Sequence, residues 1–258
     1  MIKIENVVLP SAEQWQAIIR GMRNPHNSWD LSDSKTYLGR FDRFEAGDAD
    51  IKLMRKLANG GPVHAKYRRM IPVYMDITAP LYWWKEFDTY KVGTVANSCS
   101  TMHKIADKEF ELSDFSHEHL SIASAAMLHQ IIETLNEYRD SYLEGDGTKP
   151  PKDKFFWWQM IQLLPSSYNQ KRTVMLNYEV LAGIYRYRND HKLDEWREFC
   201  DYIKEMPYSE IITDRYGKND DKEYWEKYNK LNDDLSKGKI TLNEARARLG
   251  LEPIEHDI

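Results

Sequence analysis

Apolar residues recur along this chain at two spacings, which predict a mixture of strands and helices. Alternating apolar positions at Ile2, Ile4 and Val7 indicate a strand within residues 1–9. Ser11 follows directly and can cap the next helix through its side-chain oxygen. Apolar residues at helical spacing and helix-ending Gly or Pro residues predict helices over residues 11–22, 48–59, 80–90, 116–143, 155–164, 173–187 and 193–204.

The segments between these helices are of three kinds. Residues 25–48 are polar and predict irregular structure, and so do the Gly and Pro residues of the loop near residues 145–154. β-favouring Ile71, Val73 and Tyr74 predict a second strand within residues 64–76. Small polar residues over 93–100 predict a turn.

The composition changes after Pro207. Residues 215–258 are rich in Lys, Asp, Asn and Glu, and Thr241 with Glu244 forms the sequence of a capping box before a short helix that Gly250 would close. We therefore expect a main domain over residues 1–210 and a small helical appendage over residues 211–258. The end of the appendage resembles the ends of some phage structural proteins, and a solvated helical tail explains the same residues.

Composition narrows the class of protein. A chain of 258 residues with a formal net charge of −5 is not expected to bind nucleic acid by bulk electrostatic attraction. The two cysteines, Cys99 and Cys200, form neither a disulfide framework nor a cysteine metal site. The start of the chain lacks a secretory pattern and no window is apolar enough to span a membrane, which predicts a cytoplasmic protein.

One polar cluster stands out as candidate chemistry. Residues 97–101 read Asn-Ser-Cys-Ser-Thr directly after an aromatic helix, and each of these side chains needs hydrogen-bond partners if it is buried. We interpret the cluster as the wall of a ligand site. Cys99 would need a cationic neighbour such as Lys91 or His103 to become a reactive thiolate.

Other chemical motifs are weaker or missing. The sequence has neither a Gly-rich nucleotide fingerprint nor a serine nucleophile elbow. His117-Glu118-His119 lacks the spacing of a helical zinc site, and we therefore predict no metal site. The basic run Lys66 to Arg69 is either a surface rim or a phosphate site beside residues 97–100. Arg186 and Arg188 are two apart on a predicted helix, so at most one of them faces a given pocket.

Several segments, taken in order, resemble the flavin-dependent thymidylate synthases. The matching segments are Tyr67-Arg68-Arg69, Ala79-Pro80-Leu81, Asn97 through His103, Leu164-Pro165, Asn177 and Arg188. The likeness covers about residues 1–205. The family's signature is degenerate here: its Arg-His-Arg triplet is replaced around Thr89-Tyr90-Lys91, and Ser98, Met102 and His103 stand where it has Glu, Arg and Tyr.

The resemblance implies an α+β fold, with helices packed on an antiparallel sheet, and a homotetramer. It also implies reductive methylation of dUMP or a related pyrimidine nucleotide, with FAD carrying the hydride, and folate and NADPH as further cofactors. By position, Ser100 would be the catalytic residue at the nucleotide. The resemblance places Asn97, Ser98, His103 and Arg188 at the substrate, and His64, Arg69, Lys91 and Asn177 at the cofactor.

The departures from the signature leave a second hypothesis open. Loss of an arginine that pairs with phosphate removes a charge-assisted contact, and Lys91 would replace it only as a point charge. The alternative is therefore a catalytically inactive phage protein that binds or sequesters a nucleotide on the same scaffold. A third interpretation is a purely structural oligomer that uses the appendage to dock elsewhere.

Overall fold

The structure is a computed structural model and describes residues 2–40, 42–213, 230–231, 233–235 and 237–248. The chain divides into two compact units, residues 1–213 and residues 214–258. The strands of the first unit are β1 (Lys3–Val8), β2 (Lys35–Tyr37), β3 (Arg43–Glu45), β4 (Pro72–Pro80), β5 (Val95–Ser98) and β6 (Asn169–Asn177). Its α-helices are α1 (Ala12–Arg23), α2 (Asp48–Asn59), α3 (Leu81–Phe87), α4 (Thr101–Lys104), α5 (Ile122–Glu144), α6 (Lys154–Leu163), α7 (Tyr178–Arg188), α8 (Asp194–Lys204) and α9 (Glu210–Thr213). Short 3-10 helices are η1 (Asn24–His26), η2 (Trp29–Leu31), η3 (Ala65–Met70) and η4 (Leu112–Asp114).

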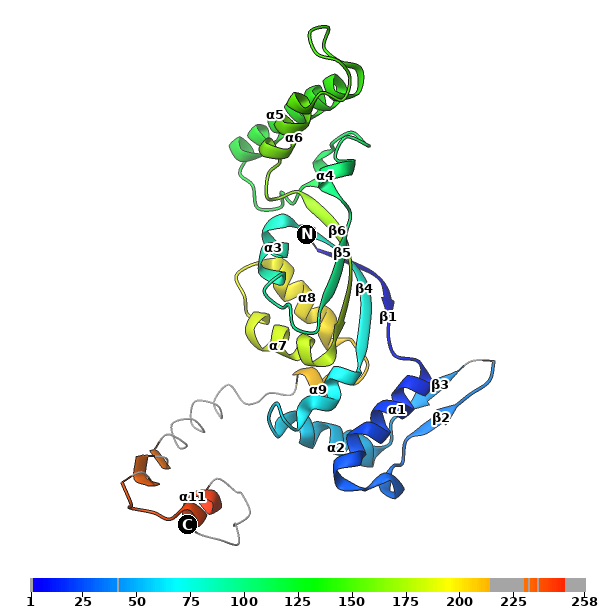
Figure 1. The fold of residues 1–258 in the computed structure, drawn as a ribbon, viewed down its shortest axis with the longest axis vertical. Helices are drawn as coiled ribbons and strands as arrows, with labels where there is room; N and C mark the ends of the chain where they lie inside the picture. Colours follow the sequence, from blue (N-terminus) through cyan, green and yellow to red (C-terminus); the bar gives the residue numbers. More distant parts are fainter. Residues whose placement is uncertain (1, 41, 214–229, 232, 236, 249–258) are drawn as a thin grey trace. The chain divides into compact units, whose positions relative to one another are not determined.

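A four-stranded antiparallel sheet in the order β1-β4-β6-β5 is the centre of the first unit (Figure 1). Along β4, Val73, Met75 and Ile77 are fully buried, whereas the residues between them are exposed or half-buried. Side chains alternate between the two faces of a strand, so this pattern gives the sheet one covered face and one open face. The predicted fold class, α+β with helices on an antiparallel sheet, is confirmed.

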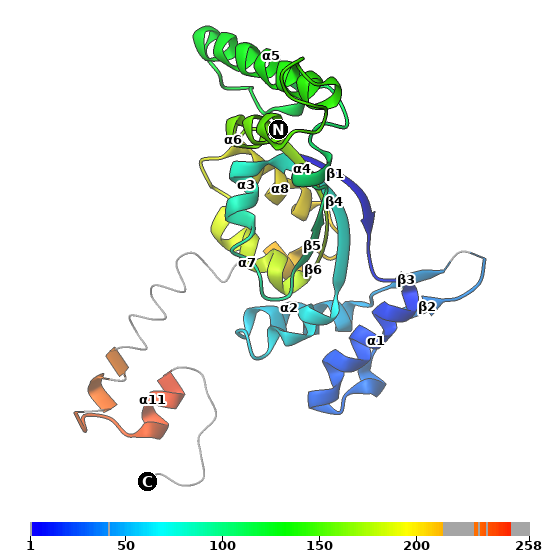
Figure 2. The same ribbon diagram turned by 45° about the horizontal axis from the view of Figure 1, so that its top comes forward.

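Helices α3, α7 and α8 lie on the covered face of the sheet in both ribbon views (Figures 1 and 2). Their contact is aromatic: Trp83, fully buried, packs against Trp84, Phe87 and Trp196 with ring centroids 4.6–5.1 Å apart. Truncating one such buried aromatic residue typically costs about 3–5 kcal/mol, so this cluster is a main source of the unit's stability.

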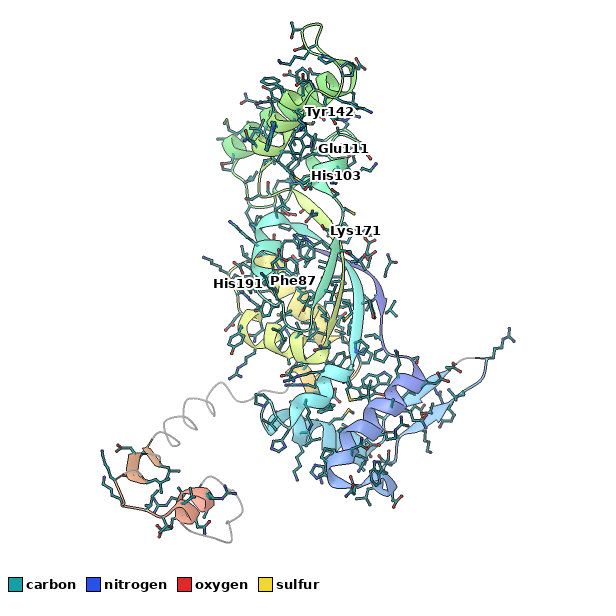
Figure 3. The ribbon with its side chains drawn as sticks, viewed as in Figure 1. Phe87, His103, Glu111, Tyr142, Lys171 and His191 are labelled. Atoms are coloured by element: carbon teal, nitrogen blue, oxygen red, sulfur yellow. The ribbon has the colours of Figure 1, made fainter. Side chains whose placement is uncertain are left out.

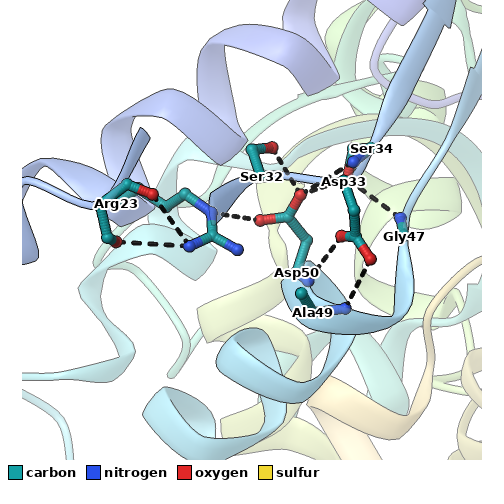
Figure 4. Close-up of polar contacts among 8 residues, drawn as sticks. Arg23, Ser32, Asp33, Ser34, Gly47, Ala49 and Asp50 are labelled. Atoms are coloured by element: carbon teal, nitrogen blue, oxygen red, sulfur yellow. Dashed lines mark hydrogen bonds and ion pairs between the residues drawn. The ribbon is translucent and has the colours of Figure 1, made fainter. Parts of the chain in front are cut away.

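Helices α1 and α2 are joined by a buried ion pair (Figure 4). The Asp50 carboxylate accepts hydrogen bonds from Arg23 Nε at 2.5 Å, from the hydroxyls of Ser32 and Ser34 at 2.7 and 2.6 Å, and from the Ser34 amide. Asp33 accepts from the amides of Ala49 and Asp50 in the first turn of α2. Burial alone would raise the pKa of Asp50, but the hydrogen bonds from Ser32, Ser34 and Arg23 outweigh it and lower that pKa.

A second hydrophobic cluster lies between α5 and α6. Leu128, Ile132 and Leu135 are its buried positions on α5, and Met160 is fully buried on α6. Helical spacing within the predicted helix over residues 116–143 favours Leu120 and Met127 for the packed face, but they are 42% and 59% exposed. The helix begins at Ile122, with Ser121 as its cap, so Leu120 precedes it, and the buried face passes through Leu128 rather than Met127.

The structure corrects three other sequence assignments. Residues 173–177 belong to strand β6 and not to a helix, which begins only at Tyr178. Residues 95–98 form strand β5 within the predicted turn over 93–100. The predicted irregular stretch 25–48 contains the β2–β3 hairpin. By contrast, the helix predicted over residues 48–59 is confirmed at both ends.

In the second unit, helix α11 (Leu242–Arg248) confirms the short helix predicted in the appendage. The Glu244 carboxylate accepts from the Thr241 amide at 2.8 Å, and the Thr241 hydroxyl accepts from the Glu244 amide at 3.2 Å. This reciprocal pair is the predicted capping box. The predicted closure at Gly250 lies outside the described residues.

We predict that Asp50→Asn lowers the free energy of unfolding by about 3 kcal/mol at pH 7, because it leaves Arg23 as an uncompensated buried charge. Urea denaturation measures the effect. Asp48→Asn, at an exposed position in the first turn of the same helix, is the matched control and should change stability far less.

The same pair of variants tests the pKa of Asp50. Because its folded-state pKa is lowered, its stabilising contribution is complete above the unfolded pKa of about 4 and is lost as the pH falls through the folded value. The stability gap between the wild type and Asp50→Asn should therefore narrow on acidification below pH ~4. A gap that stays constant down to pH ~2 would contradict this assignment.

Candidate functional site

Strand β5 brings the central polar cluster to the edge of the sheet. All four of its residues are exposed, and among the described strands it pairs with β6 alone. Asn97 lies opposite Thr173 and so belongs to the open face, whereas Ser98 lies opposite Arg172 on the other side of the strand. Asn97 and Ser98 have no side-chain hydrogen bond to any described residue, so both have free donors and acceptors available to a ligand.

The residues after β5 form a short capped turn. The Ser100 hydroxyl accepts a hydrogen bond from the His103 amide at 3.1 Å and so caps helix α4. No basic side chain of the described chain lies within hydrogen-bonding distance of this hydroxyl, so Ser100 is not arranged as an activated nucleophile. The His103 side chain is exposed on α4 (Figure 3).

A polar network occupies the open face beside Asn97. The Asp76 carboxylate accepts from Thr173 Oγ1 at 2.6 Å and Asn6 Nδ2 at 2.9 Å, and pairs with Lys171 Nζ at 3.1 Å. The hydrogen bond from Thr173, followed by those from Asn6 and Lys171, lowers the pKa of Asp76 to about 2. Asp76 in turn raises the pKa of Lys171, so the pair is ionised at neutral pH.

Sequence reasoning missed Lys171, which is labelled in Figure 3, and its neighbour on the same face, Thr173. Both follow from the alternation in β6, where Gln170, Val174 and Leu176 are buried on one face, and Lys171, Thr173 and Met175 belong to the open face. That period-two pattern is present in the sequence, but the helix that begins at Tyr178 is predicted from the sequence to extend back over residues 173–177.

The four predicted cofactor residues lie on β6 or on segments that lead into β4 and β5 at one end of the sheet. Asn177 is the last residue of β6 and lies opposite Pro72, the first residue of β4. His64 and Arg69 precede β4 in the chain, and Lys91 precedes β5. The side chains of His64, Arg69 and Lys91 are exposed and have no ion pair or hydrogen bond within the described residues.

The Asn177 side chain has a structural contact of its own. Its amide oxygen accepts from the Val180 amide at 3.1 Å and caps helix α7. Gly93 approaches it so closely that a Cβ at that position would lie 3.0 Å from Asn177 Nδ2, and the glycine has a φ of +81°. The neighbouring Thr94 hydroxyl is buried without a hydrogen-bond partner in the described chain. Residues 91–94 are thus held tightly against the start of α7.

Arg188 lies on the other face of the sheet from Asn97, among the covering helices. Its Nη1 donates to Glu86 Oε2 at 2.7 Å and its Nε donates to the Tyr90 hydroxyl at 3.0 Å. The guanidinium also stacks 4.8 Å from the centroid of the Trp196 ring. Arg188 therefore joins α3, α7 and α8, and the structure does not bring it together with Asn97.

Arg68, rather than Arg69, is the buried arginine of the basic run. Its Nε donates to Glu179 at 2.8 Å and its Nη1 donates to the Ile211 carbonyl at 2.9 Å. The described residues contain no cluster of three His, Cys, Asp or Glu that could hold a metal ion. They contain no helix long and apolar enough to cross a membrane.

Comparison with known proteins supports the fold. No protein-family model matches this chain, and no curated protein matches it. Two solved structures of the flavin-dependent thymidylate synthase ThyX from Helicobacter pylori, each complexed with FAD and dUMP, resemble it with TM-scores of 0.54. The first is 14% identical and the second 13%; the alignments cover 82% of this chain and 96% and 95% of theirs. At this identity the likeness shows a ThyX-like fold.

We predict that Arg188→Ala lowers the free energy of unfolding by about 1–2 kcal/mol, since it removes a partly buried ion pair and a cation–π contact. Urea denaturation measures the loss. Lys192→Ala, an exposed position just beyond α7 without a partner in the described chain, is the control. Equal stability of the two variants would contradict a structural role for Arg188.

Proposed function

We propose that this chain binds FAD and a pyrimidine nucleotide of the dUMP class and catalyses reductive methylation of that nucleotide, with folate as carbon donor and NADPH as reductant. The observation that carries the proposal is the ThyX-like fold, because nearly the whole length of two ThyX chains, both complexed with FAD and dUMP, aligns with residues of this protein. The division into a thymidylate synthase-like domain over residues 1–210 and an appendage over residues 211–258 is part of the proposal.

The free hydrogen-bonding groups support the substrate assignment. Asn97 offers an amide, Ser98 a hydroxyl and His103 an imidazole, all exposed along β5 and α4. An amide can both donate to and accept from the polar edge of a pyrimidine. We assign these three residues, with Ser100 at the adjoining cap, to nucleotide binding.

The charges at the end of the sheet fit a flavin dinucleotide. Arg69 and Lys91 are cations without a carboxylate partner in the described chain, and a pyrophosphate supplies the negative charge they lack. Arg69, Lys91, His64 and Asn177 are the residues that would hold the cofactor, and bound flavin would supply the hydride. Arg188 would act as a positioning residue, because its bond to the Tyr90 hydroxyl fixes the segment that carries Lys91.

The open face of the sheet supports the proposed homotetramer. Val8, Tyr74, Met175 and Val95 form one row across all four strands, with Val8 and Val95 each 58% exposed and Tyr74 48% exposed. An apolar row on an uncovered sheet face is the kind of surface that another subunit buries.

We predict that the purified protein shows the visible absorbance bands of oxidised flavin and that dUMP raises its melting temperature by mass action. Lys91→Ala should weaken FAD binding, and Asn97→Ala should weaken dUMP binding, each by about 2–10-fold for one lost hydrogen bond or charge contact. Lys85→Ala, an exposed lysine of α3, is the control and should change neither.

The outcomes separate the two hypotheses. Flavin binding, a dUMP shift and dTMP formation with folate and NADPH would support the enzyme. A colourless protein that takes up no added flavin but still binds dUMP would favour the inactive nucleotide-binding protein. A protein that binds neither ligand would refute both.

We predict that Tyr74→Glu dissociates the homotetramer, because it places a charge within the apolar row. Sedimentation velocity measures the assembly state. Tyr187→Glu introduces the same change at a tyrosine that is 67% exposed at the end of α7, away from the row, and should leave the assembly intact. A wild-type monomer, or a tetramer in both variants, would contradict this part of the proposal.

A further inference from the structure

A cavity of about 330 Å³ lies between α1 and the β2–β3 hairpin, and none of the residues assigned to the nucleotide or to FAD lines it. Helix α1 contributes Gln16, Arg20 and Arg23 to its wall, Trp29 comes from η2, and Phe44 comes from β3. Pockets for small molecules begin at about 300 Å³, so the cavity suits a ligand at the small end of that range.

Hydrogen bonds hold the Arg23 guanidinium in place through Nε and Nη1 and leave Nη2 without a partner in the described chain (Figure 4). Its Nε donates to Asp50, and its Nη1 donates to the backbone and side-chain oxygens of Ser28 at 3.1 and 3.3 Å. Nη2 has no hydrogen bond to any described residue. Because the side chain is only 4% exposed and cannot reorient, this nitrogen is a preorganised donor at the cavity wall.

Arg20 lies one turn before Arg23 on the same face of α1. It is exposed, and it has neither an ion pair nor a side-chain hydrogen bond within the described chain. No Asp or Glu is among the described residues that line the cavity. The Asp50 charge compensates Arg23, so Arg20 leaves the cavity with a net positive charge that favours an anion.

The rest of the wall is uncharged and includes two aromatic side chains, Trp29 and Phe44. Phe44 is fixed by stacking on Trp15 with ring centroids 5.6 Å apart, and the Trp29 indole is fixed by its bond to Asn24 Oδ1 at 2.8 Å. Gln16 and Thr36 add side-chain polar groups that make no hydrogen bond to other described residues. Rigid aromatic walls suit a planar ring, and the two guanidinium groups suit an attached carboxylate or phosphate.

We propose that this cavity binds a small organic anion made of one planar ring that carries a carboxylate or a phosphate group. The site is independent of the proposed FAD and nucleotide sites. Its hairpin wall sets its specificity, because Thr36 and Phe44 enclose the ring while α1 supplies the charge.

Isothermal titration calorimetry on the full chain tests the site with four probes: phenyl phosphate, benzoate, inorganic phosphate and benzyl alcohol. We expect saturable one-to-one binding of phenyl phosphate or of benzoate, with a Kd below about 1 mM, and the stronger of the two identifies the anionic group. Inorganic phosphate, which lacks the ring, and benzyl alcohol, which lacks the charge, should bind at least about tenfold more weakly.

Two variants locate the binding. Arg20→Glu should weaken the better probe about tenfold or more, because it replaces a charge-assisted contact with repulsion, and Trp29→Leu should weaken it several-fold through loss of the ring contact. Lys56→Glu, an exposed lysine of α2 without a partner in the described chain, is the matched charge reversal and should leave binding unchanged.

Three results would overturn the proposal. The first is that neither phenyl phosphate nor benzoate binds. The second is that a probe lacking the ring or the charge binds as tightly as the complete one. The third is that Arg20→Glu binds like Lys56→Glu while both variants keep the wild-type melting temperature.

Discussion

The pairing of β4 with β6 determines which side chains of the central sheet face the core and which belong to its polar open face. The two strands are in register over nine residue pairs, from Pro72 opposite Asn177 to Pro80 opposite Asn169. A shift by one residue would exchange the two faces of a strand, moving Asp76 and Thr173 into the core and Met75 and Val174 into solvent. The fully buried Met75 and Val174 make that exchange unfavourable, so burial on one face fixes the polar network on the other.

Because one face of the sheet is covered by helices and the other is open, the position of a charged side chain relative to the sheet determines whether it can contact a ligand. Arg188 and Arg68 both lie among the helices, where carboxylates and carbonyls occupy their N–H groups. Arg69 and Lys91 lie at the end of the sheet without such partners in the described chain. A buried cation destabilises the folded chain unless an anion or hydrogen-bond acceptors pair with it. An exposed cation is solvated by water, so its N–H groups stay available to a ligand. Position relative to the sheet therefore separates structural arginines from those available for binding.

Much of this arrangement could be predicted from local sequence, and the failures have physical causes. The helix at 48–59 is correct because its ends carry their own signals, with acidic residues in its first turn and Gly60 after its last residue. The prediction for β6 was wrong because its last five residues, 173–177, run directly into Tyr178 without a Gly or Pro between strand and helix. The β2–β3 hairpin was missed because each strand has only three residues, too few to show an alternating pattern of apolar and polar positions.

The candidate site was less predictable than the fold, because its properties depend on partners distant in sequence. Nothing near Arg188 in the chain shows that Glu86, 102 residues away, would pair with it. Nothing near Arg23 shows that Asp50 would hold it, although the two residues lie only 27 apart. Sequence patterns identify residues capable of binding an anion, but tertiary pairing decides which of them remain free to do so. The availability of a side chain, and not its type alone, is what a site assignment requires from a structure.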